Sequence, residues 1–327
     1  MIDCICELDY RDAAIDAIKA AGSRLPRGGE LEMRRYAYET VDVFTEQRFG
    51  GNQLAVFTDA RGLSDAEMQS LAAEMNYSET TFVLPPDDPA HTARVRIFTR
   101  THEMPFAGHP NVGTAFVLAR HGRDRDGVLL FEEKAGLVEV RVVRDGGGQV
   151  AGATIAAPQP LSLGVEMPVE GIAACAGLRP DEIVTAAHRP IRASVGVHFV
   201  LAEVAPEALS RAAPDLVAFR SLRDATSALE GRLSLFLYTR DGSAIRARMF
   251  APLSGTWEDP ATGSASATTA ALLLSLDGGE MAEFQLTQGV EMGRRSLLDL
   301  KAWHTPDGFR ASVGGSCVPV LRGEAML

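Results

Sequence analysis

Hydrophobic and polar residues alternate along much of this chain with the period of two that is typical of β-strands. Strands are predicted at residues 36–44, 54–57, 77–84, 95–98, 128–131, 137–143, 153–156, 197–204, 233–238, 244–250, 284–288 and 309–313. Helical spacing is found between these strands, at residues 63–76, 108–120, 169–176, 181–187 and 261–274. A chain with many strands and few helices is predicted to be an α+β protein.

Two of the predicted helices lack a polar face. Residues 112–119 are apolar or small around nearly the whole circumference, and residues 261–274 consist almost entirely of Ala, Ser, Thr and Leu. A helix that is apolar or small on every side is buried on every side. We therefore expect each of these helices to lie at the centre of a strand-rich barrel.

The same short phrase precedes both of these helices. Residues 108–115 read GHPNVGTA and residues 258–265 read EDPATGSA, and the strands before them contain Arg96-Ile97-Phe98 and Arg248-Met249-Phe250. A duplicated strand, loop and helix predicts two pseudo-symmetric halves. It also predicts a site at the place where the two helix N-termini meet.

The repeat suggests domain boundaries. We expect a first half at residues 34–157 and a second half at residues 158–327, with the last strand free to cross back to the first half. The weakly periodic segment 158–168 marks the boundary between the halves. Residues 1–33 precede the first strand and contain a predicted helix at 13–21. They are either a natural, mobile extension or an artefact upstream of a start at Met33.

Composition narrows the class of protein. The chain has 327 residues and a formal net charge of −11, without a basic patch, so a nucleic-acid partner is not expected. Cys4, Cys6, Cys175 and Cys317 lack zinc-like spacing, which favours reduced thiols in a cytoplasmic protein. No apolar run approaches the roughly 20 residues needed to span a membrane, and the acidic first residues do not match a signal peptide.

The helix starts are the first candidates for chemistry. Asp259 is placed to be an N-cap with Pro260 at the first helical position, and His109 with Pro110 repeats this arrangement. An open helix N-terminus presents free N–H groups and positive potential, which suit a carboxylate ligand. Thr114 and Ser264 would add hydroxyl donors one turn into the helices. The alternative is that these residues only cap the helices.

Glu79 is the second candidate, because it stands at the mouth of an otherwise apolar strand. Glutamate is poorly suited to such a strand. If it is buried, desolvation raises its pKa and makes it a proton carrier near neutral pH. The alternative is an exposed carboxylate at the end of a strand. The histidines lack metal-ligand spacing, and we find no nucleotide or cofactor motif, so we expect neither a metal nor a cofactor.

Several phrases together carry a family resemblance. They are Val41-Asp42-Val43-Phe44-Thr45, Phe49-Gly50-Gly51-Asn52, Asn76-Tyr77-Ser78-Glu79-Thr80, Pro105-Phe106-Ala107-Gly108-His109-Pro110, Glu258-Asp259-Pro260-Ala261-Thr262-Gly263-Ser264-Ala265 and the closing Val313-Gly314-Gly315. In these phrases the chain resembles the PhzF family, the phenazine-biosynthesis-like isomerases. The resemblance implies the diaminopimelate-epimerase-like fold, with a strand-rich barrel around a central helix in each half.

The resemblance also implies roles for residues. Glu79 corresponds to the acid/base that moves a proton between carbons, while His109 and Asp259 assist and orient the substrate. The expected substrate-binding residues are Gly108, Asn111, Thr262, Gly263 and Ser264. Epimerases of this fold carry a cysteine at each helix start, and this chain has none there, which disfavours two-cysteine racemisation. Gln53 replaces the usual proline after Gly-Gly-Asn, a change that we expect to be mild.

These observations predict a cofactor-independent isomerase. It would shift a proton between carbons of a small, carboxylate-bearing substrate that is amino-acid-like and cyclic or unsaturated. Two alternatives stay open: an epimerase or racemase on the same fold, and a non-catalytic protein that binds small carboxylates. The resemblance further implies a homodimer.

Overall fold

A computed structural model of the protein describes residues 33–327, of which Tyr36–Ala325 form one compact unit. The predicted helix at 13–21, Cys4 and Cys6 lie outside the described residues, as does nearly all of the predicted extension 1–33. At the ends of the described chain, Arg34 and Leu327 exchange two backbone hydrogen bonds of 2.9 Å. Within the part that is described, no helix combines the length and the hydrophobicity needed to cross a membrane.

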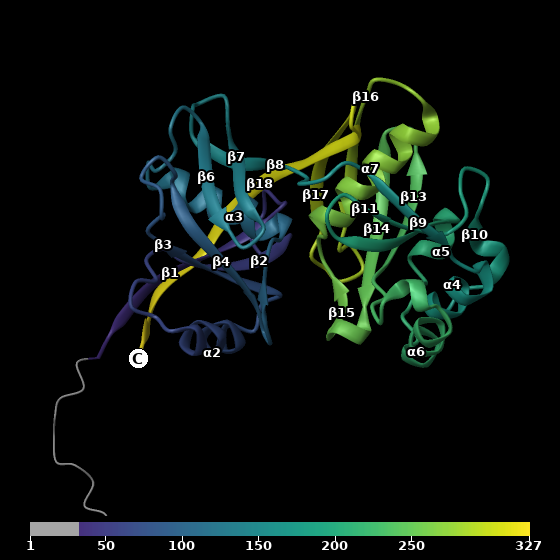
Figure 1. Ribbon diagram of the computed structural model, residues 1–327, viewed down its shortest axis with the longest axis horizontal. Helices are drawn as coiled ribbons and strands as arrows, with labels where there is room; N and C mark the ends of the chain where they lie inside the picture. Colours follow the sequence, from purple (N-terminus) through teal and green to yellow (C-terminus); the bar gives the residue numbers. More distant parts are fainter. Residues whose placement is uncertain (1–32) are drawn as a thin grey trace, which may run out of the picture. The chain divides into compact units, whose positions relative to one another are not determined.

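The first half is a curved sheet around one helix (Figure 1). Its elements are β1 (Arg35–Val43), β2 (Asn52–Phe57), α2 (Asp65–Met75), β3 (Glu79–Leu84), β4 (Ala93–Thr99), β5 (Glu103–Met104), α3 (Gly108–Arg120), β6 (Val128–Glu133), β7 (Gly136–Arg144) and β8 (Val150–Ala156). The strands pair successively from β1 through β2, β3, β4, β6 and β7 to β8. The inner helix α3 packs against β2, β3, β7 and β8.

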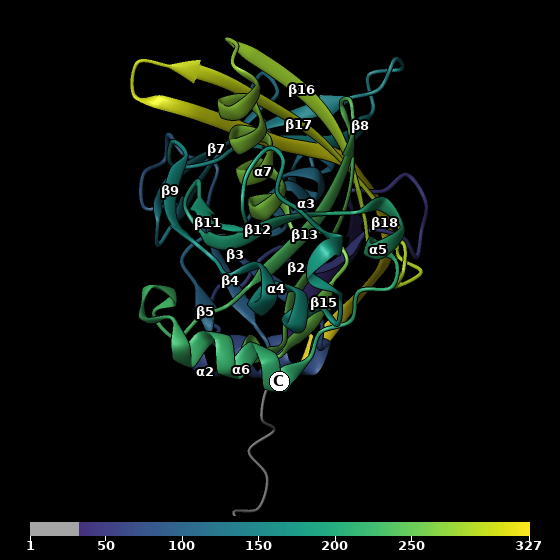
Figure 2. The same cartoon turned by 90° about the vertical axis from the view of Figure 1, so that its right-hand side faces the viewer.

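The second half repeats this plan and adds a helical layer. Its elements are β9 (Ser162–Glu166), α4 (Val169–Ala176), the single turn η1 (Pro180–Glu182), β10 (Ile183–Val184), β11 (Ile191–Ser194), β12 (His198–Val204), α5 (Pro206–Leu209), α6 (Leu216–Ala225), η2 (Ser227–Leu229), β13 (Leu235–Asp241), β14 (Ala244–Ala251), η3 (Pro252–Ser254), β15 (Thr256–Asp259), α7 (Gly263–Asp277), β16 (Met281–Gln288), β17 (Ser296–Thr305) and β18 (Gly308–Met326). Here α7 packs against β11, β12, β16 and β17, as Figure 2 shows from the side.

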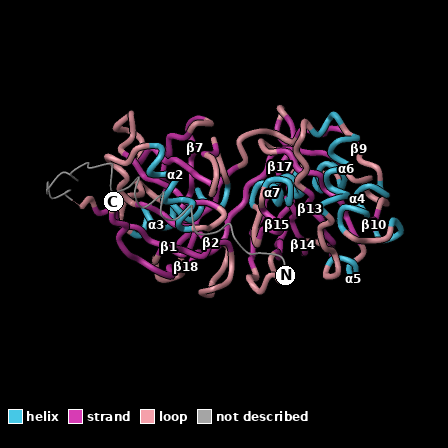
Figure 3. Tube along the Cα trace, turned by 90° about the horizontal axis from the view of Figure 1, so that it is seen from below, coloured by secondary structure: helices cyan, strands magenta, loops and turns pink. Residues whose placement is uncertain are grey.

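Both inner helices are buried as predicted. Every residue from Gly108 to Ala119 of α3 is buried, and α7 is buried from Ala265 to Leu274. Figure 3 shows both helices as cyan segments among the magenta strands. The hydroxyls of Ser266, Thr268 and Thr269 donate to carbonyls one turn earlier in α7, which satisfies polar groups that water cannot reach.

The last strand connects the two halves. In Figure 1, β18 runs as a long yellow ribbon from one half to the other, and it pairs with β17 in the second half and with β8 in the first. Arg294 adds a polar contact between the halves, because its guanidinium donates to Asp42 at 2.6 Å and to the carbonyl of Gly51 at 2.9 Å.

Several details differ from the sequence-based expectation. The predicted helix at 181–187 is wrong: after the turn Pro180–Glu182, Ile183 and Val184 form β10 and pair with β12. These two apolar residues form a strand because the backbone of β12 beside them offers hydrogen-bond partners. The weakly periodic segment 158–168 contains β9, and α6 was not predicted from the sequence.

Candidate active site

The site lies where the N-termini of α3 and α7 meet. Gly108 is the first residue of α3 and Gly263 the first of α7. A side-chain carbon added to Gly108 would lie only 3.7 Å from the backbone nitrogen of Ser264. The first N–H groups of a helix have no partner within it, so two positive helix ends converge on one small region.

The helix starts themselves differ from the prediction. Thr262 and Ala107 occupy the N-cap positions, and neither makes a side-chain capping bond. Asp259 is therefore not the cap of α7, and it ends β15 opposite Met249 of β14. Pairing with β14 holds Asp259 in an extended backbone, so the helix begins four residues later. His109 is the second residue of α3.

Glu79 and His109 form the first part of the site. Glu79 opens β3, opposite Leu54 of the parallel strand β2, and its side chain keeps 17% exposure. One of its carboxylate oxygens lies 3.4 Å from Nδ1 of His109. The other ring nitrogen, Nε2, lies 3.3 Å from the carbonyl oxygen of Gln53. Since a carbonyl only accepts, Nε2 carries the hydrogen, and in neutral His109 the lone pair of Nδ1 is directed to the Glu79 side.

Burial shifts both groups toward their neutral forms. Desolvation raises the pKa of Glu79 to about 7, although the neighbouring Ser78 hydroxyl and the charge of Arg100 oppose the rise. Desolvation lowers the pKa of His109 to about 4, against the opposing effects of Asp259 and the Gln53 carbonyl. His109 is therefore neutral near pH 7, where Glu79 changes between acid and carboxylate.

Asp259 is the third titratable group. Its Oδ1 accepts from Nδ2 of Asn52 at 3.0 Å, and its Oδ2 accepts from the hydroxyl of Thr262 at 2.6 Å. Desolvation and the nearby charge of Glu79 raise its pKa to about 6, although the hydrogen bond from Thr262, the electrostatic effect of His109 and the hydrogen bond from Asn52 lower it. Three titratable groups that influence one another thus lie together in a buried region, as is common at functional sites.

Two amide side chains in this network were not assigned a role from the sequence. Asn52 donates to Asp259 and to the carbonyl of Ala261 and accepts from the hydroxyl of Ser78, the neighbour of Glu79. Gln288 donates to the carbonyl of Asp259 at 2.7 Å and accepts from the N–H of Thr262. Asn52 belongs to the Gly-Gly-Asn phrase that carried the family resemblance, whereas no pattern in the sequence distinguishes Gln288.

Other predicted positions have different surroundings. Asn111 is fully buried and donates to the carbonyl of Ala107, so its amide serves the first turn of α3. The hydroxyl of Thr114 pairs with that of Thr81 at 2.8 Å, and this corrects the expectation that Thr114 donates at the helix start. Ser264, the second residue of α7, does lie at the site.

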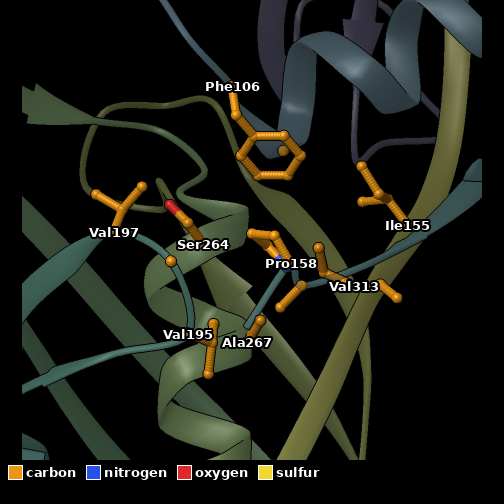
Figure 4. Close-up of a pocket in the computed structure, with 12 residues that line it drawn as sticks. Phe106, Ile155, Pro158, Val195, Val197, Ser264, Ala267 and Val313 are labelled. Carbon is orange, nitrogen blue, oxygen red and sulfur yellow. The ribbon is translucent and has the colours of Figure 1, made fainter. Parts of the chain in front are cut away.

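An apolar cavity begins at the helix starts (Figure 4). Its volume is about 20 Å³, close to the space that one water molecule needs, and Gly108 and Ser264 lie on its wall together with the side chains of Phe106, Ile155, Pro158, Val195, Val197, Ala267 and Val313. The Ser264 hydroxyl is the polar side-chain group among these. In residues 33–327, no three or more His, Cys, Asp or Glu side chains gather as metal ligands would.

The class of protein follows from this arrangement together with known relatives. The pattern of the family described as "Phenazine biosynthesis-like protein" matches residues 41–323. An uncharacterized isomerase of Mesorhizobium japonicum is 40% identical to this chain. The aligned region covers 90% of this chain and the full length of that protein. The trans-2,3-dihydro-3-hydroxyanthranilate isomerase of Pseudomonas chlororaphis is 35% identical over 89% of this chain and 99% of its own.

Solved structures agree with the fold. The phenazine biosynthesis protein of the PhzF family from Bacillus anthracis superposes with a TM-score of 0.80 at 24% identity, covering 90% of this chain and all of that one. Hydroxyproline epimerase and proline racemase structures, at 14% identity or less, share the same architecture. This architecture is the diaminopimelate-epimerase-like fold. The chain belongs to the PhzF family and is an isomerase.

Proposed function

We propose that this isomerase moves a proton between two carbons of a small, unsaturated or cyclic, amino-acid-like carboxylate, with Glu79 as the group that carries the proton. The observation that supports this most directly is the place of Glu79: a carboxyl group with a pKa near 7, beside a neutral histidine, where two helix N-termini meet. A general base works best when its pKa is close to the working pH.

The proposed reaction uses one proton and one electron pair. Ionised Glu79 removes a proton from a carbon that is acidified by conjugation, and the C–H electrons move into the π-system. Nδ1 of His109 can accept a hydrogen bond from the protonated Glu79. Glu79 then returns the proton to another carbon of the same π-system, so the product is an isomer and the enzyme is restored.

The helix starts would hold the substrate carboxylate. Backbone N–H groups near Gly108, Gly263 and Ser264 can bind charge that develops on the carboxylate as the electrons move. The apolar side chains of the small pocket beside them (Figure 4) would contact the carbon skeleton, and the pocket would widen to admit it. The named substrate of the Pseudomonas chlororaphis relative, trans-2,3-dihydro-3-hydroxyanthranilate, combines a carboxylate with an unsaturated ring and is the first compound to test.

An epimerase is the second candidate. The observation in its favour is Asp259, whose raised pKa of about 6 makes it a second proton carrier in the same site. Glu79 and Asp259 would then act on one carbon, and the product would be an inverted centre in place of a moved double bond. The expected homodimer and cytoplasmic location are part of the proposal as well.

Proton exchange in D₂O tests the proposal. The protein is incubated with trans-2,3-dihydro-3-hydroxyanthranilate and with a panel of small cyclic amino acids, and deuterium uptake is followed by NMR. We expect uptake at a carbon, and a loss of roughly 10²–10⁴-fold in Glu79→Gln. The labelled position separates the isomerase from the epimerase.

The matched control is Glu74→Gln, which removes an exposed carboxylate near the end of α2. It should exchange at the wild-type rate, and Glu79→Gln should still bind the ligand. Full exchange by Glu79→Gln, or joint loss of its folding and binding, would contradict the proposed role. Ligand binding by the wild type without any exchange would favour a binding protein.

A further inference from the structure

The repeated Arg-x-Phe phrase builds the same side-chain clamp in both halves. Arg248 of β14 donates through Nε and Nη2 to the two carboxylate oxygens of Glu258 on β15, both at 2.8 Å. Arg96 of β4 does the same to Glu103 on β5, at 2.8 and 2.7 Å. Each arginine also lies over the phenylalanine two residues later. In both halves the clamped strand is the one that leads into the central helix.

The clamp at Arg248 is almost fully buried. The residue is 6% exposed, and the Glu258 side chain is 12% exposed. The remaining nitrogen, Nη1, donates to the carbonyls of Leu209 and Ala212 at 3.1 and 2.6 Å. Arg248 thus ties β15 to the segment after α5, in a planar geometry that lysine cannot reproduce.

Apart from the bonds that Asn52, Thr262 and Gln288 make to Asp259, the strand that this clamp holds has little support. β15 contains only Thr256–Asp259, and among residues 33–327 its strand partner is β14, which it meets through a register shift between Met249 and Ala251. A short edge strand with few ladder bonds opens easily. Glu258 directly precedes Asp259, so a movement of the clamped residue is transmitted to the Asp259 carboxyl.

We propose that Arg248 is a positioning residue that acts through Glu258 to hold Asp259 against Glu79 and His109. The inference rests on the proposed function for the role of Asp259 in turnover. In the first half, the clamped residue is farther along the chain from its site residue, because Glu103 precedes His109 by six residues, whereas Glu258 directly precedes Asp259. The effect on activity should therefore be larger at Arg248 than at Arg96.

The test replaces Arg248 with lysine, which keeps the charge and removes the two-pronged contact. We expect kcat for proton exchange to fall about tenfold or more with KM changed less than about threefold, since small misplacements of a reacting group slow turnover. Arg240→Lys is the matched control. Arg240 lies on the neighbouring strand β13 and forms a two-pronged pair with Asp277 at the surface, so this variant should be unaffected.

A second readout does not depend on turnover. The Asp259 carboxyl is titrated by carbon NMR, with Asp259→Asn to assign its signal and Glu79→Gln to separate the signal of the facing carboxyl. In the wild type the pKa should lie near 6, and in Arg248→Lys it should fall toward 3.8 as the strand opens and water reaches Asp259.

Glu258→Gln tests the same clamp from the other side, and the double variant should be no slower than the slower single variant. An unchanged titration of Asp259 together with an unchanged kcat in Arg248→Lys would overturn the inference, as would fully additive losses in the double variant. If the wild type shows no exchange, the proposed function fails, and the Asp259 titration alone still decides whether Arg248 positions this residue.

Discussion

Glu132 and Glu133 are neighbours on β6, and their side chains have opposite surroundings. Glu132 accepts hydrogen bonds from the N–H groups of Asp87 and Asp88 and contacts His91, and these bonds hold its pKa at about 2. Burial raises the pKa of Glu133 to about 8, although the nearby Asn111 amide opposes the rise. Ionisation of Glu132 therefore stabilises the folded protein, whereas ionisation of Glu133 destabilises it.

Glu133→Gln should make the protein more stable at high pH. The folded pKa of Glu133, about 8, lies above its unfolded value of 4.5. The contribution of neutral Glu133 to the free energy of unfolding is therefore fully present below about pH 4.5 and is lost as pH rises through 8. Glutamine stays neutral, so the variant should gain on the order of a few kcal/mol over the wild type between pH 5 and pH 9. Urea unfolding at pH 5, 7 and 9 measures this gain.

The control is Glu132→Gln on the same strand. Because the folded pKa of Glu132 is lowered, its contribution is present above its unfolded pKa of 4.5 and disappears as pH falls toward 2. This variant should be less stable than the wild type at neutral pH and should approach it in acid. A pH-independent difference between Glu133→Gln and the wild type would show that Glu133 is not held in its neutral form.

At the scale of elements, the turn between β1 and β2 delivers Asn52 to the site. Gly51 has a φ of +60°, and a side-chain carbon there would lie 2.2 Å from the carbonyl oxygen of Val43, so only glycine fits. This turn places Asn52 at the start of β2, from which its amide crosses to Asp259 of the second half. The Gly-Gly-Asn turn therefore links the two halves at the site through the side chain of Asn52.

Asn52→Ala should impair both stability and turnover. It leaves the buried oxygens of Asp259 and Ala261 without this donor, which costs about 1–3 kcal/mol of unfolding free energy. We expect exchange to slow about tenfold or more because Asp259 loses one of its two side-chain partners. Exchange rates and urea unfolding, measured on the same preparations, test the two effects.

The neighbouring variant Gln53→Ala serves as the control. Gln53 contacts His109 through its backbone carbonyl, which alanine retains, so its exchange rate should stay within about twofold of the wild type. Equal rates for Asn52→Ala and the wild type would mean that Thr262 and Gln288 hold Asp259 without help from Asn52.

The central helices were predictable from the sequence because their physical requirement is local. A run of apolar and small residues without a polar face demands burial, and the structure buries α3 and α7 on all sides. The meeting of their N-termini followed from the repeated phrase. The starting residue of α7 could not be predicted from that phrase. It depends on the pairing of Asp259 with β14 and on the contacts of Gln288, which are made by segments distant in the sequence.

The same distinction applies to the site. Glu79 stood out as a carboxylate in an apolar strand, and burial raises its pKa as that position suggested. The roles of Gln288 and Arg248 are invisible along the chain, since each depends on a partner in another element. Likewise, β10 looked helical because two apolar residues cannot reveal the sheet edge that they join.

At the scale of the whole molecule, the site requires both halves. Glu79 and His109 come from the first half and Asp259 from the second, and β18 joins the sheets of both. β18 approaches β8 closely at two glycines: a side-chain carbon on Gly152 would lie 2.0 Å from the carbonyl oxygen of Gly315. Backbone lies on both sides of this contact, so neither strand can move aside without breaking the ladder.

Gly152→Ala should therefore destabilise both halves together, by at least about 2 kcal/mol, because overpacking forces the backbone apart. Trp257 and Trp303 are the tryptophans of the chain, and both lie in the second half, whereas Gly152 lies in the first. Unfolding in urea, followed by tryptophan fluorescence, should shift to a lower midpoint even though the substitution is in the other half. Gly146→Ala, at an open turn with nothing within 4 Å, should leave the midpoint unchanged. If the tryptophan transition stayed at the wild-type midpoint in Gly152→Ala while circular dichroism showed a second, earlier transition, the halves would unfold independently, and the crossing of β18 would not couple them.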